Sequence, residues 1–188
     1  DAIVKAYDIR GVVPDQLDAQ AAYALGVSFA KFTGSSAVVV AHDMRPSGPD
    51  LVDAFQRGLL AHGVSVTNLG LASSDLLYYA SGKLDMPGAM FTASHNPAQY
   101  NGIKCCLSGA RSIGIDNGLR EMKAIAAEVL AGREPAPAAT AGKLDHVNML
   151  SEFADHVVRF IAGDTLRPLK IVADTANGMG GLVVPAIF

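Results

Sequence analysis

Short apolar runs alternate along the chain with segments that repeat apolar residues at helical spacing, and this alternation restricts the fold class. Runs typical of strands lie at 3–13, 37–41, 64–69, 88–91 and 102–107. Helical spacing is found at 18–31, 47–63 and 116–132, and a short helix is expected at 74–81. Strands that alternate with helices predict an α/β fold with a mostly parallel mixed sheet sandwiched between helices.

Polar residues and glycines indicate where the expected helices begin and end. Asp18 and Ser47 are placed to cap the first two helices, and Asp116 is placed to cap a later one that ends near Gly132. Gly34 follows the first helix, where a left-handed residue commonly ends one. These signals put the helices between the strands, as an α/β sheet requires.

The composition changes near residue 133, which suggests two domains. Residues 133–142 are rich in proline and alanine, as linkers often are. A helix is expected at 145–161 and a new strand at 169–173. We therefore expect an N-terminal α/β domain at 1–140, followed at 141–188 by a connecting helix and the truncated start of a second similar domain.

The composition also excludes some classes of partner. Half of the 188 residues are hydrophobic, and the formal charge of −3 gives no general attraction for nucleic acid or anionic lipid. The adjacent Cys105 and Cys106 are too few for a disulfide framework or a zinc site. No signal segment or membrane span is evident, so a cytoplasmic protein is expected, with no prediction of its oligomeric state.

A polar cluster follows the apolar run at 88–91, where a strand is expected to end. Ser94, His95 and Asn96 lie there, and Lys104 follows ten residues after Ser94. In α/β sheets this edge commonly binds ligands. Three interpretations of Ser94 are a hydrolase nucleophile, a serine that carries a phosphoryl group, and a serine that only stabilises a loop. The first is disfavoured, because adjacent side chains point apart in an extended backbone and no Gly-x-Ser-x-Gly motif is present.

Arginines lie near two other strand ends. Arg10 follows Tyr7 near the N-terminus, and its fork can hold phosphate in a bidentate way. Arg45 follows the run at 37–41 and supports either the Ser94 loop or its phosphate. A surface ion pair with Asp43 or Asp50 is an equally acceptable interpretation of Arg45.

Several motifs together resemble one known family. Thr92-Ala93-Ser94-His95-Asn96-Pro97 looks like the phosphoserine loop of the α-D-phosphohexomutase superfamily, and Ala6-Tyr7-Asp8-Ile9-Arg10-Gly11 resembles the N-terminal motif of its phosphomannomutase/phosphoglucomutase branch. The resemblance continues at 42–48, 100–104 and 172–178. It implies a phosphohexomutase domain 1 fold and an isomerase of carbohydrate metabolism. This enzyme would move a phosphoryl group between the 1- and 6-positions of mannose or glucose through a phosphoserine and a bound 1,6-bisphosphate.

The resemblance also implies roles for individual residues. The catalytic group would be Ser94, His95, Lys104 and Arg10, and the substrate would be bound by Tyr7, Arg10, Asn96 and Arg45. Phosphorylated Ser94 would be one contact of a Mg²⁺ ion, and glucose or mannose 1,6-bisphosphate would serve as activator and intermediate. The glycine-rich turn at 177–181 resembles the structural start of a second domain, and its phosphate-binding signal is weak.

Some motifs of the family are not in this sequence. The Asp-Gly-Asp-Gly-Asp-Arg metal loop and the sugar-recognition loop are missing, so the resemblance implies an N-terminal piece that is inactive by itself. Two alternatives stay open. One is a phosphoglucosamine mutase, and the other is a noncatalytic α/β module that binds a sugar phosphate or nucleotide.

Overall fold

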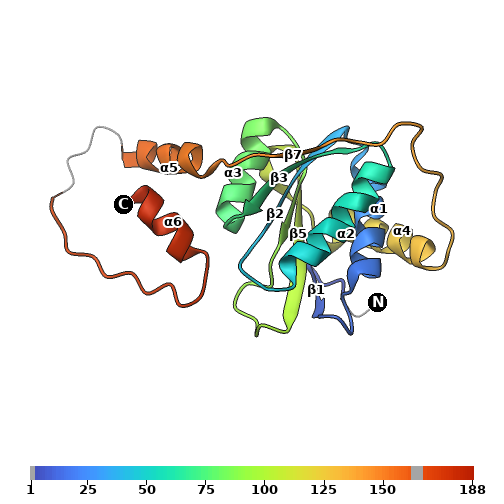
Figure 1. The fold of residues 1–188 in the computed structure, drawn as a ribbon, viewed down its shortest axis with the longest axis horizontal. Helices are drawn as coiled ribbons and strands as arrows, with labels where there is room; N and C mark the ends of the chain where they lie inside the picture. Colours follow the sequence, from blue (N-terminus) through green and yellow to red (C-terminus); the bar gives the residue numbers. More distant parts are fainter. Residues whose placement is uncertain (1–2, 162–166) are drawn as a thin grey trace.

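The computed structural model describes residues 3–161 and 167–188, which form a mixed sheet with helices on both faces (Figure 1). The strands are β1 (Ile9–Val12), β2 (Ala37–His42), β3 (Ser65–Leu71), β4 (Gly88–Phe91), β5 (Tyr100–Leu107), β6 (Arg111–Ser112) and β7 (Leu144–His146). The α-helices are α1 (Ala19–Thr33), α2 (Gly48–Ala61), α3 (Ser74–Leu84), α4 (Arg120–Leu130), α5 (Leu150–Val158) and α6 (Gly180–Ile187). Short helical turns lie at Ser108–Ala110, Ile115–Leu119 and Arg159–Ile161.

The sheet confirms the predicted fold class. Its order is β1-β5-β4-β2-β3-β7, and β6 pairs with the other end of β5. The β2–β3, β2–β4 and β3–β7 pairs are parallel, whereas β5 is antiparallel to β1, β4 and β6. Among the described strands, β5 alone therefore runs in the reverse direction.

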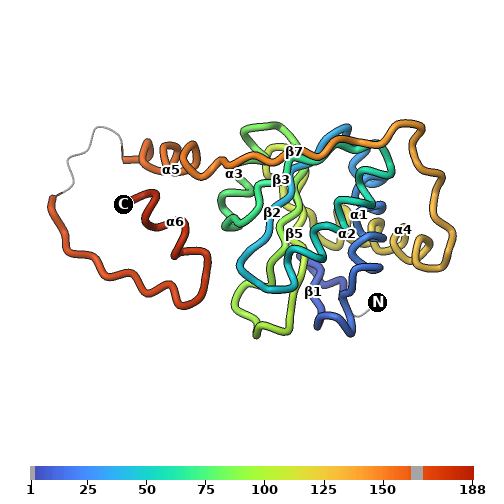
Figure 2. Tube along the Cα trace, in the orientation of Figure 1, coloured from blue at the N-terminus to red at the C-terminus, as the bar shows by residue number. Residues whose placement is uncertain are grey.

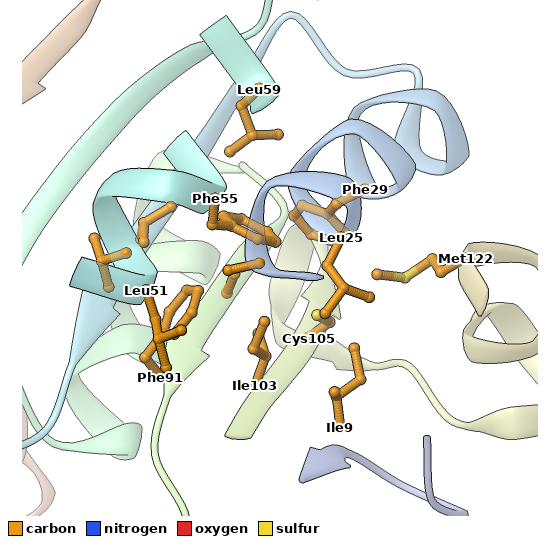
Figure 3. Packing of buried hydrophobic residues seen from close by; sticks show 14 of the residues in the cluster. Ile9, Leu25, Phe29, Leu51, Phe55, Leu59, Phe91, Ile103, Cys105 and Met122 are labelled. Atoms are coloured by element: carbon orange, nitrogen blue, oxygen red, sulfur yellow. The ribbon is translucent and has the colours of Figure 1, made fainter. Parts of the chain in front are cut away.

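Two apolar clusters cover the two faces of the sheet. One cluster joins α1, α2 and α4 to the sheet around Phe29, Phe55 and Phe91 (Figure 3). The ring centroids of Phe55 and Phe91 are 5.3 Å apart in an edge-to-face arrangement. The other cluster packs α3, α5 and α6 against residues such as Met90.

Two glycines allow α1 and α2 to cross closely. A Cβ atom at Gly26 would lie 2.1 Å from the Phe55 carbonyl oxygen. A Cβ atom at Gly58 would lie 2.4 Å from the Tyr23 carbonyl oxygen. The helix backbones are therefore in contact at positions where any side chain would force them apart.

The helix signals were only partly correct. Asp18 caps α1 by accepting a hydrogen bond from the Ala21 N–H at 2.7 Å, and Gly34 ends that helix with φ of +57°. Ser47 precedes α2 but caps no N–H with its side chain. Asp116 does not cap α4, because an irregular turn at Ile115–Leu119 comes first and the helix begins at Arg120.

The segment after residue 132 also differs from the prediction. The Ala138 N–H donates to the Ala61 carbonyl, and the Gly142 N–H donates to the Leu60 carbonyl, so the expected linker lies against α2. The helix predicted from 145 begins only at Leu150, because β7 precedes it and pairs with β3. Figure 2 shows the path of the chain from α4 through this segment to α5. The domain boundary near 140 stays a prediction.

The strand predicted at 169–173 is not formed. These residues have no regular secondary structure, and Leu169, Ile171 and Val172 are exposed. An isolated apolar run has no strand beside it to complete its backbone hydrogen bonds, so its sequence pattern alone does not make it a strand.

Candidate functional site

The Ser94 loop follows β4 and lies beside the loop that follows β2. Because β2 and β4 are parallel neighbours, their carboxyl ends meet at one edge of the sheet. This brings residues 43–47 against residues 92–97, although about fifty positions separate them in sequence. The sequence predicted both loops at strand ends, and the register places them together.

Arg45 binds the backbone of the Ser94 loop. Its side chain is only 5% exposed and donates to four loop carbonyls, at distances of 2.7–2.9 Å, those of Ser94, Asn96, Pro97 and Tyr100. The Nε atom lies 3.4 Å from Asp43 Oδ2. All five guanidinium N–H groups therefore face the protein, and this geometry makes Arg45 a support of the loop. Its predicted contact with substrate stays a prediction.

A second buried connection reaches the backbone of Ser94. The Thr92 hydroxyl donates to Asp43 Oδ2 at 2.7 Å and accepts a hydrogen bond from the Ser94 N–H at 3.0 Å. Asp43 and Thr92 are both buried. The backbone of the serine is therefore fixed through an uninterrupted chain of charge and hydrogen bonds that starts at Arg45.

The Ser94 side chain itself is exposed. The residue has φ of +55°, in the left-handed region that is uncommon for residues other than glycine. This conformation interrupts the extended backbone, so Ser94 Oγ and His95 Nδ1 lie 3.2 Å apart. The expectation that the two side chains point apart was wrong. The serine hydroxyl thus has an imidazole within hydrogen-bond distance and access from solvent.

Two asparagines stabilise the surroundings. The Asn96 side chain donates to the Ala93 carbonyl at 2.8 Å, inside the loop. Asn101 is completely buried and donates to Ser47 Oγ at 2.9 Å. Sequence reasoning missed Asn101, although it lies in the motif at 100–104.

The remaining predicted site residues do not line the cavity at Ser94. Tyr7 and Lys104 line a cavity of about 470 Å³ together with Tyr78 and residues 112–117. Lys104 pairs with Met90 in the sheet register and therefore shares the face covered by α3. Arg10 forms an ion pair with Asp8. In the described part of the chain, no hydrogen bond or ion pair joins Arg10 or Lys104 to Ser94.

A separate cavity of about 610 Å³ opens at Ser94. It is lined by Met44, Arg45, Pro46, Ser94, His95, Asn96, Ala98 and residues 175–178. The sequence analysis treated the last segment as structural, and its place in this cavity was not foreseen. Because 175–178 lies far from the loop in sequence, only the packing of α6 could reveal this.

The described residues offer little for a metal ion. No group of three or more His, Cys, Asp or Glu side chains that could hold one occurs in 3–161 or 167–188. Asp43, which is hydrogen-bonded to Thr92 under the loop, also faces Arg45. The metal contact at Ser94 stays a prediction, and the described residues do not by themselves fit Mg²⁺. None of the helices in the same two ranges is long and apolar enough to span a membrane.

Comparison with known proteins decides the family. Residues 1–133 match the family model described as phosphoglucomutase/phosphomannomutase, alpha/beta/alpha domain I. This chain belongs to that family. Curated relatives of this phosphoglucomutase/phosphomannomutase domain include "Phosphohexose mutases" of Xanthomonas campestris, 38% identical, and a phosphomannomutase of Vibrio cholerae, 35% identical. Each alignment covers 96% of this chain but only 40% and 39% of the relative.

A solved structure of the same family shares the arrangement. A phosphoglucomutase/phosphomannomutase family protein from Burkholderia thailandensis is 31% identical and superimposes with a TM-score of 0.83. The match covers 99% of this chain and 41% of the other. It therefore includes both the sheet and the segment after residue 167. The chain spans about two fifths of the length of these relatives.

Proposed function

We propose that the protein containing this chain is a phosphohexomutase that transfers a phosphoryl group reversibly between the 1- and 6-positions of mannose or glucose phosphate through Ser94. The observation that carries this proposal is the exposed Ser94 hydroxyl on a loop fixed by buried Arg45, Asp43 and Thr92. Family membership and the names of the relatives support the reaction class.

The loop geometry suits a group that must be loaded and unloaded repeatedly. In one half-reaction, the sugar 6-hydroxyl attacks the phosphorus of phosphorylated Ser94 and loses its proton to a base, the bond from phosphorus to the serine oxygen breaks, that oxygen takes up a proton, and a 1,6-bisphosphate forms. In the other, Ser94 Oγ attacks the phosphorus of the 1-phosphate and loses its proton to a nearby base, the bond from that phosphorus to sugar oxygen O1 breaks, and O1 takes up a proton. His95 Nδ1, 3.2 Å from that oxygen, is placed to exchange this proton. A fixed backbone keeps the serine oxygen aligned in both directions.

The proposal includes partners that this chain does not hold by itself. When bound, Mg²⁺ would neutralise charge on the transferring oxygens, with the Ser94 phosphate as one contact and further ligands from residues outside this chain. Glucose or mannose 1,6-bisphosphate would be the activator. Arg10 and Lys104 would act with His95 as catalytic neighbours of Ser94, and Tyr7 and Arg10 would bind the phosphosugar. We propose a cytoplasmic location because Cys105 and Cys106 are free thiols, which are typical of a reducing compartment.

The decisive experiment compares full-length wild-type protein with Ser94→Ala. Intact mass and peptide mapping should find one phosphate on Ser94 of the wild type and none in the variant, whose turnover of mannose 1-phosphate and glucose 1-phosphate should be lost. Ser151→Ala is the control, because Ser151 is an exposed serine on α5. Full activity of Ser94→Ala would refute phosphoryl transfer through Ser94, and a wild type without turnover or phosphate on Ser94 would favour the noncatalytic alternative. A preference for glucosamine phosphate would favour the phosphoglucosamine mutase alternative.

A further inference from the structure

A turn before α6 forms one wall of the Ser94 cavity. The Ala176 N–H donates to Asp174 Oδ1 at 3.0 Å, and the Gly178 N–H donates to the Thr175 carbonyl at 3.0 Å. Ala176 has φ of +47°, which makes the turn tight. The helix that follows is anchored, because Val183 is 9% exposed and belongs to the cluster with Met149 and Leu76. The turn therefore has a defined shape and a packed support.

The proposed catalytic loop lines the same cavity. Its lining includes Ser94, His95 and Asn96 together with residues 175–178. A volume of about 610 Å³ lies within the range of small-ligand sites. A ligand that reaches the Ser94 hydroxyl therefore occupies a space that the turn also borders.

Thr175 and Asn177 are the polar residues of this turn whose side chains make no hydrogen bond within the two described ranges, and Asn177 is the more exposed of the two. A carboxamide both donates and accepts, as a sugar hydroxyl does. The guanidinium of Arg45, also on the cavity wall, is already satisfied by loop carbonyls. The wall thus offers neutral hydrogen-bonding groups, which suit sugar hydroxyls better than a second phosphate.

We infer that Asn177 is a substrate-binding residue that hydrogen-bonds a ring hydroxyl of the hexose held at Ser94. This inference rests on the proposed function, since it assigns a contact to the same phosphosugar. It changes the role of the turn from a structural start of a domain to part of the sugar site.

The test measures steady-state kinetics of the full-length protein with Asn177→Ala and with a set of monodeoxy hexose 1-phosphates. A lost hydrogen bond should raise KM about 3- to 10-fold and leave kcat nearly unchanged, because the contact is made in ground state and transition state alike. For the deoxy sugar that lacks the contacted hydroxyl, wild type and variant should have equal KM. Gln20→Ala is the matched control, because Gln20 is an exposed carboxamide on α1 that does not line the cavity.

Two further measurements separate the possible failures. Once Ser94 carries phosphate, the slow hydrolysis of that phosphate by water should have the same rate in wild type and Asn177→Ala, because this step does not involve the sugar. If the wild type turns over hexose phosphates but Asn177→Ala has the same KM as the wild type, the inference alone is overturned. The same holds if Asn177→Ala raises KM equally for every deoxy sugar. A wild type that neither carries phosphate on Ser94 nor turns over hexose phosphates would overturn the proposed function, and the inference with it.

Discussion

At the scale of single residues, the candidate site depends on side chains that never meet the ligand. The Ser94 hydroxyl was identifiable from its motif, but its orientation depends on Arg45, Asp43 and Thr92 beneath it. The sequence left Arg45 open between loop support and a surface ion pair. Local spacing does not reveal burial, and burial is what makes this ion pair a part of the loop.

Arg45→Ala should destabilise the fold and the loop together. The change leaves Asp43 buried without its cation and four carbonyls without donors, so the free energy of unfolding should fall by about 3–5 kcal/mol. Urea unfolding of the full-length protein measures this. Arg57→Ala removes an exposed pair with Asp53 and should cost less than about 0.5 kcal/mol. Equal losses of unfolding free energy in the two variants would contradict the role of Arg45 as a support of the Ser94 loop.

At the scale of elements, patterns within one segment were reliable and patterns that need a second segment were not. The Asp18 cap and the strand at 37–41 depend on neighbouring residues, and both were predicted. Ser47 makes no capping bond to α2, and its hydroxyl accepts a hydrogen bond from Asn101 on β5. The strand β7 was read as helix because three residues carry little periodicity and only pairing with β3 defines them.

The close crossing of α1 and α2 predicts that two glycine-to-alanine substitutions change stability in opposite directions. Gly26→Ala places a Cβ 2.1 Å from the Phe55 carbonyl, so the helices must separate, and the free energy of unfolding should fall by about 1–3 kcal/mol or more. Gly82→Ala in α3 meets no atom within 4 Å and should stabilise by about 0.4–1 kcal/mol. Thermal melts of both variants measure the difference. A tolerated Gly26→Ala would show that the helices can move apart at little cost.

At the scale of the whole molecule, the segment after α4 joins the two helices α1 and α2. Glu134 Oε1 accepts from the Tyr23 hydroxyl at 2.8 Å and lies 3.1 Å from His62 Nε2. Sequence composition predicted a loose linker here, because proline and alanine say nothing about contacts with distant residues. The Ser94 cavity could not be predicted for the same reason, since its far wall belongs to residues 175–178.

The Glu134 contacts should make stability depend on pH. Burial raises the pKa of Glu134, but hydrogen bonds from Tyr23 and His62 outweigh it and leave the pKa below its ordinary value. The stabilisation is therefore present above about pH 4.5 and lost as pH falls through the lower pKa of the folded state. The free energies of unfolding of wild type and Glu134→Gln, measured with urea, should differ at pH 6 by less than about 1 kcal/mol, because the group is largely exposed. The two values should converge by pH 3. A constant difference across this range would contradict the assignment.

The reversed strand β5 carries Cys105 and Cys106, both buried and free. Burial raises the pKa of the Cys105 thiol, so its reactive thiolate is scarce in the folded protein. A thiol-labelling reagent can therefore reach these two sulfur atoms only when the centre of the sheet opens. The rate of labelling therefore reports how often the centre of the sheet opens, and the two natural cysteines make an engineered probe unnecessary.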